Sequence, residues 1–289
     1  MKISITICEY NPLHLGHIRQ LNFIKENIKP DIIAVILSGN FTERGDSAVC
    51  DKYTRATWAI NAGADVVFEL PTVFATGNAE IFAKGALKIA NSLPGEKVLC
   101  FGTECDDANS LIEIAKTMLI ESDEYKKNLK KELKDGNAFA KARFNALSKT
   151  YPNLDLAPLT TPNNILGVEY IKAILQNDYD ISIKTIKRNS DFNESKIITK
   201  SPSALSIRNA IASGKKNRCK NAVPKFVYKD LPNKLPDFSR EIIYSLLKSD
   251  KDTLKRLPDV SEGLENKIKA LVKDNFNIEE LLSKLKTKR

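Results

Sequence analysis

The chain contains only two histidines, His14 and His17, and both lie near its N-terminus. They follow the apolar run Ile3–Cys8, which predicts a strand, and open an amphipathic stretch at 17–28, which predicts a helix. A strand–loop–helix junction presents unpaired backbone N–H groups and the positive end of a helix dipole, a combination that binds phosphate. Imidazoles at that junction can donate to phosphate oxygens and stabilise charge that develops during in-line attack. We therefore expect a nucleotide site with His14 and His17 as catalytic residues.

Two other interpretations of the histidine pair compete with phosphate binding. The pair could hold zinc, although no third histidine exists and the five cysteines show no ligand spacing. Both rings could instead be structural caps. The phosphate interpretation predicts that replacing either ring slows catalysis by about two to three powers of ten and leaves folding nearly unchanged. Gly16 would leave room for the nucleotide to lie against the backbone.

The first hundred residues alternate short apolar runs with helical patterns. This alternation predicts a parallel sheet with helical crossovers, an α/β fold. The turn-rich pieces Gly39–Asp46 and Glu69–Gly77 follow the second and third strands, at the carboxyl edge where such sheets bind ligands. We expect strands at 3–8, 32–37, 66–69 and 98–101, and helices at 17–28, 53–61 and 80–92.

The rest of the chain is predicted to form a helical insertion, the end of the sheet and a helical tail. Residues 109–149 are helical and highly charged, and 181–186 predict a further strand. We expect a catalytic domain at 1–212 with an insertion at about 108–150, then a basic linker and an α-helical region at 213–289. The other helices are expected at 164–176, 203–212, 239–248, 261–273 and 278–286, with the linker at 213–221.

The net charge of +9 is unevenly distributed over the 289 residues. Between positions 181 and 220, ten basic residues against two acids leave +8. Such a segment suits polyphosphate or nucleic acid, although a solvated basic surface has the same composition. No apolar run approaches the roughly 18 residues of a membrane span, so we expect a cytoplasmic protein with no membrane partner. The sequence does not indicate an oligomeric state.

Several motifs carry a resemblance to a known family. The His-Leu-Gly-His stretch at 14–17 resembles the HxGH nucleotidyltransferase superfamily, and its neighbours resemble the bacterial tRNA(Met) cytidine acetate ligase family within it. The resemblance implies a Rossmann-like, HUP-type parallel sheet. The matching stretches are Glu9–Pro12, Ser38–Gly45, Phe68–Pro71, Phe101–Glu104, Pro162–Gly167 and, in the tail, Glu262–Asn266.

The resemblance implies a ligase reaction in two steps. ATP, accompanied by Mg²⁺, and acetate would give acetyl-adenylate and pyrophosphate. The acetyl group would then pass to the N4 amine of the wobble cytidine of elongator tRNA(Met), forming N4-acetylcytidine, and acetyl-CoA would not be the donor. Acetate is already a nucleophile and the mixed anhydride is already activated, so the protein needs mainly to position the reactants and neutralise charge. We expect no covalent enzyme intermediate.

The resemblance also implies which residues bind ATP. Gly102, one asparagine of the pair Asn163 and Asn164, and Arg188 would complete a site whose main part wraps the nucleotide. That main part is Ile7, Cys8, Glu9, Tyr10, Asn11, Pro12, Leu13, His14, Leu15, Gly16, His17, Ile18, Arg19 and Gln20.

Further residues have two interpretations each. The stretch 203–208 resembles the superfamily's second phosphate-binding motif, with Leu205 where that motif usually has Thr. Arg44 could contact phosphate or RNA, or be an exposed turn arginine. Lys52 and Arg55 could bind phosphate or form an ordinary polar helix face, and Glu69 could shape the substrate pocket or be a structural carboxylate. The possible phosphate or tRNA contacts are Arg44, Lys52, Ser203, Arg208, Lys215, Lys216, Arg218 and Lys220.

Family members usually run about a hundred residues further, so we expect a truncated chain with weakened tRNA binding. The alternative functions are a small-molecule adenylyltransferase of cofactor synthesis and a non-catalytic RNA-binding protein. The first shares the HxGH site without needing the +8 segment, and the intact histidines argue against the second. A relative of the aminoacyl-tRNA synthetases is disfavoured because no Lys-Met-Ser-Lys-Ser block is present.

Overall fold

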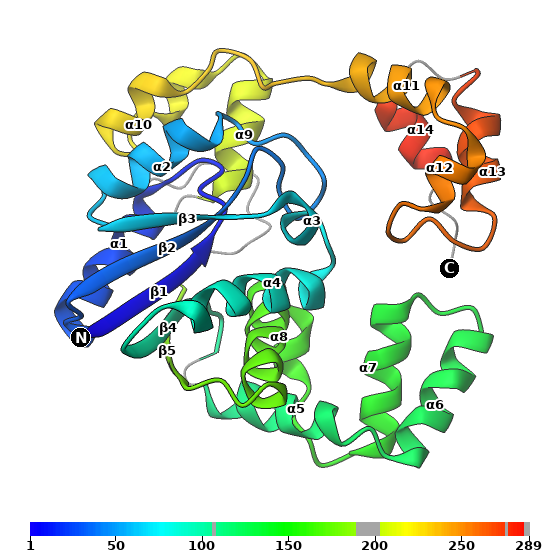
Figure 1. Ribbon diagram of the computed structural model, residues 1–289, viewed down its shortest axis with the longest axis horizontal. Coiled ribbons are helices and arrows are strands. Elements are labelled where there is room, and N and C mark those ends of the chain that lie inside the picture. The colour runs from blue at the N-terminus through cyan, green and yellow to red at the C-terminus, as the bar shows by residue number, and fades with distance from the viewer. Residues whose placement is uncertain (106–107, 189–202, 275–276, 286–289) are drawn as a thin grey trace. The chain divides into compact units, whose positions relative to one another are not determined.

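A computed structural model describes residues 1–105, 108–188, 203–274 and 277–285. Its five strands form one parallel sheet in the order β3-β2-β1-β4-β5, which confirms the predicted α/β class (Figure 1). The strands are β1 (Lys2–Cys8), β2 (Ile32–Ser38), β3 (Val66–Leu70), β4 (Glu96–Thr103) and β5 (Ile181–Lys187).

The strand order creates a crevice at the carboxyl edge of the sheet. From β1 the chain proceeds outward to β2 and β3, then returns to place β4 on the other side of β1. The loops that leave β1 and β4 therefore diverge toward opposite faces, and such a switch point is where open α/β sheets bind ligands.

Helices connect the strands on both faces of the sheet. The predicted helices are present, and the short helices α3, α10 and α12 lie in stretches for which no helix was predicted. The helices of the sheet region are α1 (Leu15–Phe23), α2 (Lys52–Asn61), α3 (Thr72–Ala75), α4 (Ala79–Ser92), α5 (Asn109–Ile120), α8 (Pro162–Gln176), α9 (Ala204–Ala212) and α10 (Lys225–Asp230). The others are α6 (Asp123–Lys134), α7 (Phe139–Thr150), α11 (Ser239–Lys248), α12 (Lys251–Lys255), α13 (Leu264–Leu271) and α14 (Ile278–Leu285).

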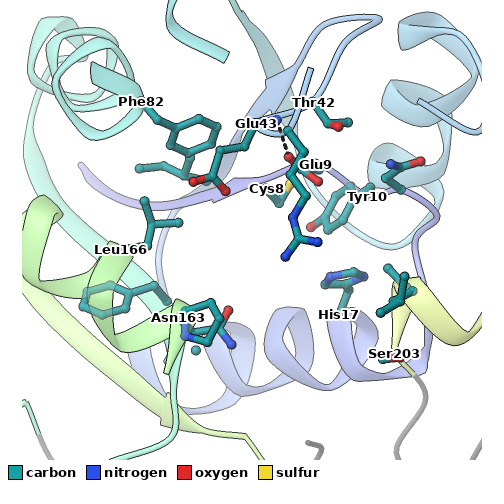
Figure 2. A pocket seen from close by; sticks show the side chains of 18 of the residues that line it. Cys8, Glu9, Tyr10, His17, Thr42, Glu43, Phe82, Asn163, Leu166 and Ser203 are labelled. Atoms are coloured by element: carbon teal, nitrogen blue, oxygen red, sulfur yellow. Dashed lines mark hydrogen bonds between the residues drawn. The ribbon is translucent and has the colours of Figure 1, made fainter. Parts of the chain in front are cut away.

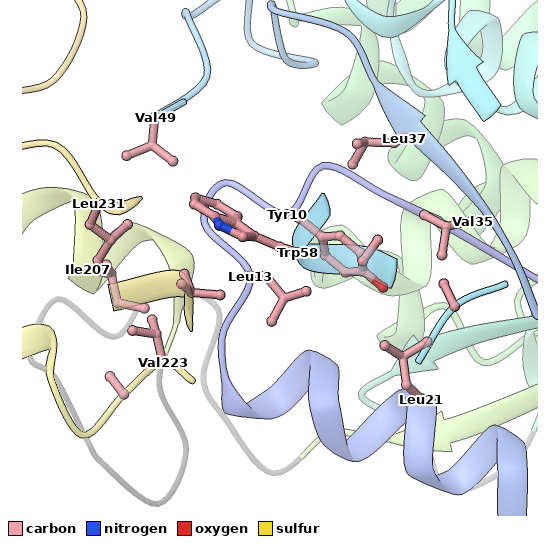
Figure 3. Close-up of a cluster of buried hydrophobic side chains, with 14 of the residues drawn as sticks. Tyr10, Leu13, Leu21, Val35, Leu37, Val49, Trp58, Ile207, Val223 and Leu231 are labelled. Atoms are coloured by element: carbon pink, nitrogen blue, oxygen red, sulfur yellow. The ribbon is translucent and has the colours of Figure 1, made fainter. Parts of the chain in front are cut away.

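The period-2 alternation of β2 divides its side chains between the two faces. Ile33, Val35 and Leu37 join a buried cluster with residues of α1, α2, α9 and α10, shown in Figure 3. Trp58 of α2 is fully buried there, and its indole N–H donates to Asp230 at 2.9 Å. This cluster fixes the starts of α1 and α9 against the same face of the sheet.

Two predicted elements differ from the structure in detail. The first helix does not continue regularly to Ile28: α1 ends at Phe23 and the chain follows a π-helix over Ile24–Ile28, closed by the N–H of Lys29 donating to the Ile24 carbonyl at 3.1 Å. The expected linker at 213–221 is mostly exposed but is anchored to the core. It contains a 3₁₀ turn, η3 (Lys216–Cys219), and Cys219 is fully buried in the core cluster.

The chain divides into two compact units. The first comprises Met1–Lys127 and Ala146–Pro236 and contains the whole sheet. The second comprises Asn128–Asn145 and Asp237–Arg289, and its small apolar cluster is built on Ile243, Val272 and Leu281. Among the described residues, no helix is both long and apolar enough to cross a membrane.

Candidate active site

A cleft of about 450 Å³ opens at the carboxyl edge of the sheet, within the first unit. It falls in the size range of small-molecule sites. In Figure 2, Phe82, Leu166 and Asn163 lie on one side of the cleft and His17 and Ser203 on the other. The predicted site residues that line it are Ile7, Cys8, Glu9, Tyr10, Asn11, His14, His17, Gln20, Arg44, Gly102, Asn163, Arg188, Ser203 and Arg208.

The side chains of the two histidines accept backbone N–H groups at the start of α1. His14 is the N-cap residue, and its Nδ1 accepts from the Gly16 backbone N–H at 3.0 Å. In return, Nδ1 of His17 accepts from the His14 backbone N–H at 3.2 Å. The rings stack with their centroids 3.8 Å apart. The pair therefore forms a capping box in which imidazoles take the places usually held by Ser and Glu.

This arrangement fixes the tautomer of both rings. A neutral imidazole that accepts at Nδ1 carries its proton on Nε2. Because both rings line the cleft, the free donor of each is its Nε2–H. The structural and phosphate-binding interpretations of the histidines are thus compatible, since each uses a different nitrogen.

Burial keeps both rings neutral. Desolvation, with a smaller contribution from the charge of Arg188, lowers the pKa of His14 to about 3. The pKa of His17 also falls well below its ordinary value, mainly through desolvation and then through His14 and Arg188. Near pH 7 the free protein therefore offers two uncharged donors, and the positive charge comes from nearby arginines.

The expectation of unpaired amides at the start of α1 was wrong. The N–H of Leu15 donates to the Ala222 carbonyl at 3.1 Å, and that of His17 donates to the His14 carbonyl at 2.9 Å. With the Gly16 N–H held by His14, the first turn has no spare donor among its first three residues. Gly16 itself has a local role, because a Cβ there would lie 2.8 Å from Cε1 of His14.

Arginines and a second helix start also line the cleft. Ser203 caps α9 by accepting from the Ser206 N–H at 3.1 Å, and Ala204 and Leu205 also line the cleft. Arg208 of α9 donates to the Asn11 carbonyl at 2.7 Å, which holds this helix against the loop after β1. Arg188 follows β5 and passes so close to Gly102 that a Cβ at that glycine would lie 3.0 Å from its Cγ.

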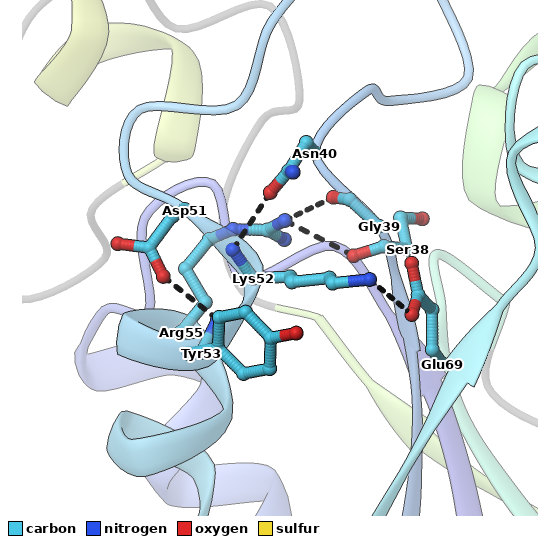
Figure 4. A network of polar contacts seen from close by, with 8 residues as sticks. All are labelled: Ser38, Gly39, Asn40, Asp51, Lys52, Tyr53, Arg55 and Glu69. Atoms are coloured by element: carbon cyan, nitrogen blue, oxygen red, sulfur yellow. Dashed lines mark hydrogen bonds and ion pairs between the residues drawn. The ribbon is translucent and has the colours of Figure 1, made fainter.

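Buried polar side chains hold the loop after β1 in place. Asn11 precedes a cis peptide bond to Pro12, and its Oδ1 accepts from the Val49 N–H at 2.7 Å. Arg55 is fully buried and donates to the carbonyls of Glu9, Ser38, Gly39 and Cys50, as Figure 4 shows in part. Neither interpretation of Arg55 describes these contacts, because its buried guanidinium binds backbone carbonyls and is neither a residue of the cleft lining nor part of an exposed polar helix face.

Lys52 and Glu69 lie outside the cleft. The ammonium of Lys52 forms an ion pair with Glu69 at 2.6 Å (Figure 4). The two residues line a separate cavity of about 160 Å³ between α2 and the ends of β2 and β3, together with Ser38 and Tyr53. The phosphate interpretation of Lys52 and the substrate-pocket interpretation of Glu69 are not supported by their positions.

The two asparagines at the start of α8 make different contacts. Asn164 is 2% exposed and bonds to the segment after β4, accepting from the Glu104 N–H at 2.9 Å. Asn163 lines the cleft, and its amide N–H donates to the carboxylate of Glu104. Of the two, Asn163 is thus the one that lines the cleft.

Other predicted residues do not line the cleft. Lys216 donates to the Leu231 carbonyl and lies over the Tyr228 ring, so it is part of the packing of η3. Lys215, Arg218 and Lys220 are exposed on the same turn, whereas Lys196 and Lys200 of the basic segment lie outside the described residues. The remaining residues away from the cleft are Pro12, Leu13, Leu15, Gly16, Ile18, Arg19 and Asn164.

Sequence reasoning missed part of the cleft. The two turn-rich loops were expected at this edge, but their cleft residues were not singled out, and the apolar wall from α4 and α8 was missed because its residues resemble ordinary helix core. The lining residues that were not named among the predicted site residues, although some lie in the matching motifs, are Thr42, Glu43, Asp46, Thr76, Gly77, Asn78, Phe82, Phe101, Pro162, Leu166, Tyr170, Ala204 and Leu205.

Comparison with known proteins agrees with this geometry. The model of the HIGH Nucleotidyl Transferase family matches residues 1–289, so the sheet and its paired histidines belong to that class of protein. A tRNA(Met) cytidine acetate ligase of Clostridium acetobutylicum is 38% identical, covering 100% of this chain and 75% of its own length. One from Caldicellulosiruptor saccharolyticus is 42% identical, covering 100% and 73%. The chain belongs to the tRNA(Met) cytidine acetate ligase family.

Solved structures agree as well. The apo crystal structure of Thermotoga maritima TmcAL matches with a TM-score of 0.92 at 31% identity, covering 100% of this chain and 72% of that one. A second crystal form of TmcAL, bound with alpha-thio ATP, matches with a TM-score of 0.89 at 31% identity, covering 100% and 71%. These matches extend over all of this chain and confirm the fold.

Proposed function

We propose that the protein is an ATP-dependent tRNA(Met) cytidine acetate ligase. It activates acetate as acetyl-adenylate and transfers the acetyl group to N4 of the wobble cytidine of elongator tRNA(Met). The observation that carries this proposal is the pair of neutral histidines with free Nε2–H donors at the start of α1, in a chain whose relatives bear that name. The complex of TmcAL with alpha-thio ATP supports ATP as the nucleotide.

The cleft suits the first step. ATP would direct its phosphates to the side formed by His14, His17, Arg188 and Arg208. A carboxylate oxygen of acetate attacks the α-phosphorus as its bond to the pyrophosphate oxygen breaks, and the Nε2–H groups donate to the phosphate oxygens as charge shifts. The rings are held before ATP arrives, so they need not reorganise during the reaction.

Mg²⁺ would enter this site with ATP as the counterion of its phosphates. Among the described residues, no three His, Cys, Asp or Glu side chains gather into a metal site, so the ATP phosphates and water would supply most of the ligands of Mg²⁺. Three carboxylates nevertheless line the cleft among its arginines. They are Glu9, Glu43 and Asp46. Glu9 is fixed by accepting the Glu43 backbone N–H at 2.9 Å, which Figure 2 shows as a dashed line.

We propose that the tRNA binds the exposed basic turn that follows α9. This helix begins at the cleft with Ser203 and leads to Lys215, Arg218 and Lys220. Nine residues of α-helix span about 14 Å, so the turn lies near enough to hold an RNA whose anticodon enters the cleft. The helical tail is proposed to contact the tRNA as well.

The proposal is tested by incubating the protein with ATP and radiolabelled acetate, with and without bulk tRNA. We expect labelled acetyl-AMP without tRNA and labelled N4-acetylcytidine with it, whereas labelled acetyl-CoA should give no product. A pocket shaped for one methyl group rejects larger acids by steric overlap. Pyrophosphate exchange should therefore respond to acetate more than to amino acids. Efficient adenylylation of nicotinamide mononucleotide or pantetheine phosphate would instead establish a cofactor-synthesis enzyme.

A further inference from the structure

Glu104 contacts both neighbouring asparagines from outside the cleft lining. Its carboxylate accepts from Nδ2 of Asn163, and its backbone N–H donates to Oδ1 of Asn164 at 2.9 Å. The second carboxylate oxygen, Oε2, is buried and has no hydrogen-bond partner among the described residues. In the described part of the chain, the carboxylate therefore makes one hydrogen bond, and its partner lines the cleft.

The chemistry of this contact fixes the orientation of the Asn163 amide. Nδ2 of Asn163 donates to the carboxylate oxygen Oε1, so the amide turns its NH₂ toward Glu104. The other end of the amide, Oδ1, is then the end left for the cleft that Asn163 lines. Asn163 consequently offers an acceptor, and the nucleotide must supply a donor.

Neighbouring charges indicate where along ATP that donor lies. Arg188 lowers the pKa of both His14 and His17 through its charge, and Glu104 opposes the lowering of the pKa of Arg188 that burial causes. Arg188 also packs against Gly102, where a Cβ would lie 3.0 Å from its Cγ, and Gly102 lies two residues before Glu104. Arg188 therefore borders the segment that holds Asn163, and it lines the same cleft as the two histidines to which the phosphates are assigned. The part of ATP joined directly to the phosphates is the ribose, and its free hydroxyls are donors.

We propose that Glu104 is a positioning residue that orients the Asn163 amide so that its Oδ1 accepts from a ribose hydroxyl of ATP. The contact to Asn163 is a charge-assisted hydrogen bond, the stronger kind, which suits it to hold one amide orientation. The inference rests on the proposed function because it takes ATP as the nucleotide in the cleft.

The test compares ATP with 2′-deoxy-ATP and 3′-deoxy-ATP in acetate-dependent pyrophosphate exchange. Loss of one ordinary hydrogen bond is worth about 0.5–1.5 kcal/mol, which is roughly 2- to 12-fold in kcat/KM. We expect the wild type to prefer ATP over one of the two deoxy analogues by that factor in kcat/KM. In Glu104→Met, which removes the acceptor that holds the amide, the preference should fall to near one. The preference is a ratio within each variant, so a change in the amount of active protein leaves it unaffected.

A second variant distinguishes positioning from a general structural role. In the double variant Glu104→Gln with Asn163→Asp, the carboxylate moves to position 163 and still presents an acceptor, while the introduced amide at position 104 supplies the donor behind it. This variant should regain the ribose preference that Glu104→Met loses. Glu113→Gln, an exposed glutamate of α5, is the matched control and should behave as the wild type.

Three results would overturn the assignment of Glu104 as a positioning residue. It fails if Glu104→Met keeps the wild-type preference, or if the double variant does not restore it. It also fails if the wild type ignores both hydroxyls and Glu104→Met alters the choice between ATP and inosine triphosphate, because Asn163 would then read the base. If the wild type shows no acetate-dependent exchange, the proposed function fails instead.

Discussion

The dual use of His14 gives a prediction that separates a structural contact from a catalytic one. Nδ1 of His14 accepts the Gly16 N–H at 3.0 Å, and Nε2 is the donor left for phosphate. Asparagine places its Oδ1 close to the position of Nδ1, and glutamine can extend its amide NH₂ toward the position of Nε2. His14→Asn therefore keeps the helix cap without the donor, and His14→Gln keeps a donor without the cap.

The two contacts have different magnitudes. Loss of an N-cap costs about 0.5–2 kcal/mol of stability, and for a unit of this size each kcal/mol lowers Tm by roughly 2–4 °C. Removal of one transition-state donor costs about 2.7–4 kcal/mol, or 10²- to 10³-fold in rate. We expect His14→Asn to melt near the wild-type temperature and to catalyse pyrophosphate exchange 10²- to 10³-fold more slowly. His14→Gln should melt a few degrees lower and keep more of the rate.

The assays are thermal unfolding followed by circular dichroism and RNA-free pyrophosphate exchange, with His14→Ala as the reference that loses both contacts. The structure thus revises the expectation that removing either ring leaves folding nearly unchanged. Wild-type exchange in His14→Asn would refute the role assigned to Nε2. Equal stability of His14→Asn and His14→Ala would refute the role assigned to Nδ1.

Three further predictions concern stability and RNA binding. Burial lowers the pKa of His14 from 6.5 to about 3, so its neutral ring contributes fully to stability above pH 6.5. This contribution is lost as the pH falls toward 3, by up to about 1.4 kcal/mol per pH unit. Urea unfolding from pH 7 to 5 should therefore show a steeper loss in the wild type than in His14→Asn, and parallel curves would contradict this. Arg55→Lys should lower the free energy of unfolding by about 2–5 kcal/mol because buried carbonyls lose donors, so an unchanged urea midpoint would count against the network. Replacing Lys215, Arg218 and Lys220 with Ser should weaken tRNA binding and reduce its log–log salt slope by roughly one unit per lost phosphate contact, while RNA-free exchange stays normal. A wild-type tRNA affinity and salt slope would show that the tRNA binds another surface.

Much of the fold could be predicted because its signals are local. The apolar runs of β1, β2 and β4 are buried strands that begin and end within two residues of the predicted limits, since a strand buried on both faces needs a continuous apolar run. The anchoring of 213–221 could not be predicted in this way. A single buried residue, Cys219, attaches that polar stretch to the core, and one cysteine gives no periodic signal.

The site shows the same limit. The spacing of His14 and His17 predicted a phosphate site at a helix start. It did not reveal that the His14 ring accepts from the Gly16 N–H and the His17 ring from the His14 N–H. The contact between Asn163 and Glu104 joins residues 59 positions apart, so no local pattern could assign the role of either asparagine. Such contacts depend on how the strand ends and α8 meet in three dimensions.

The closed start of α1 also limits what its histidines can do after acetyl-adenylate has formed. Each ring already accepts at Nδ1 and carries its proton on Nε2, so neither can take up another proton without breaking the first turn of the helix. Neither can be phosphorylated at Nδ1 for the same reason. The amine of cytidine must nevertheless lose a proton when it attacks the acetyl carbon. In the proposed second step, that proton leaves to a different acceptor: another side chain of the cleft, water, or the phosphate oxygen of the departing AMP.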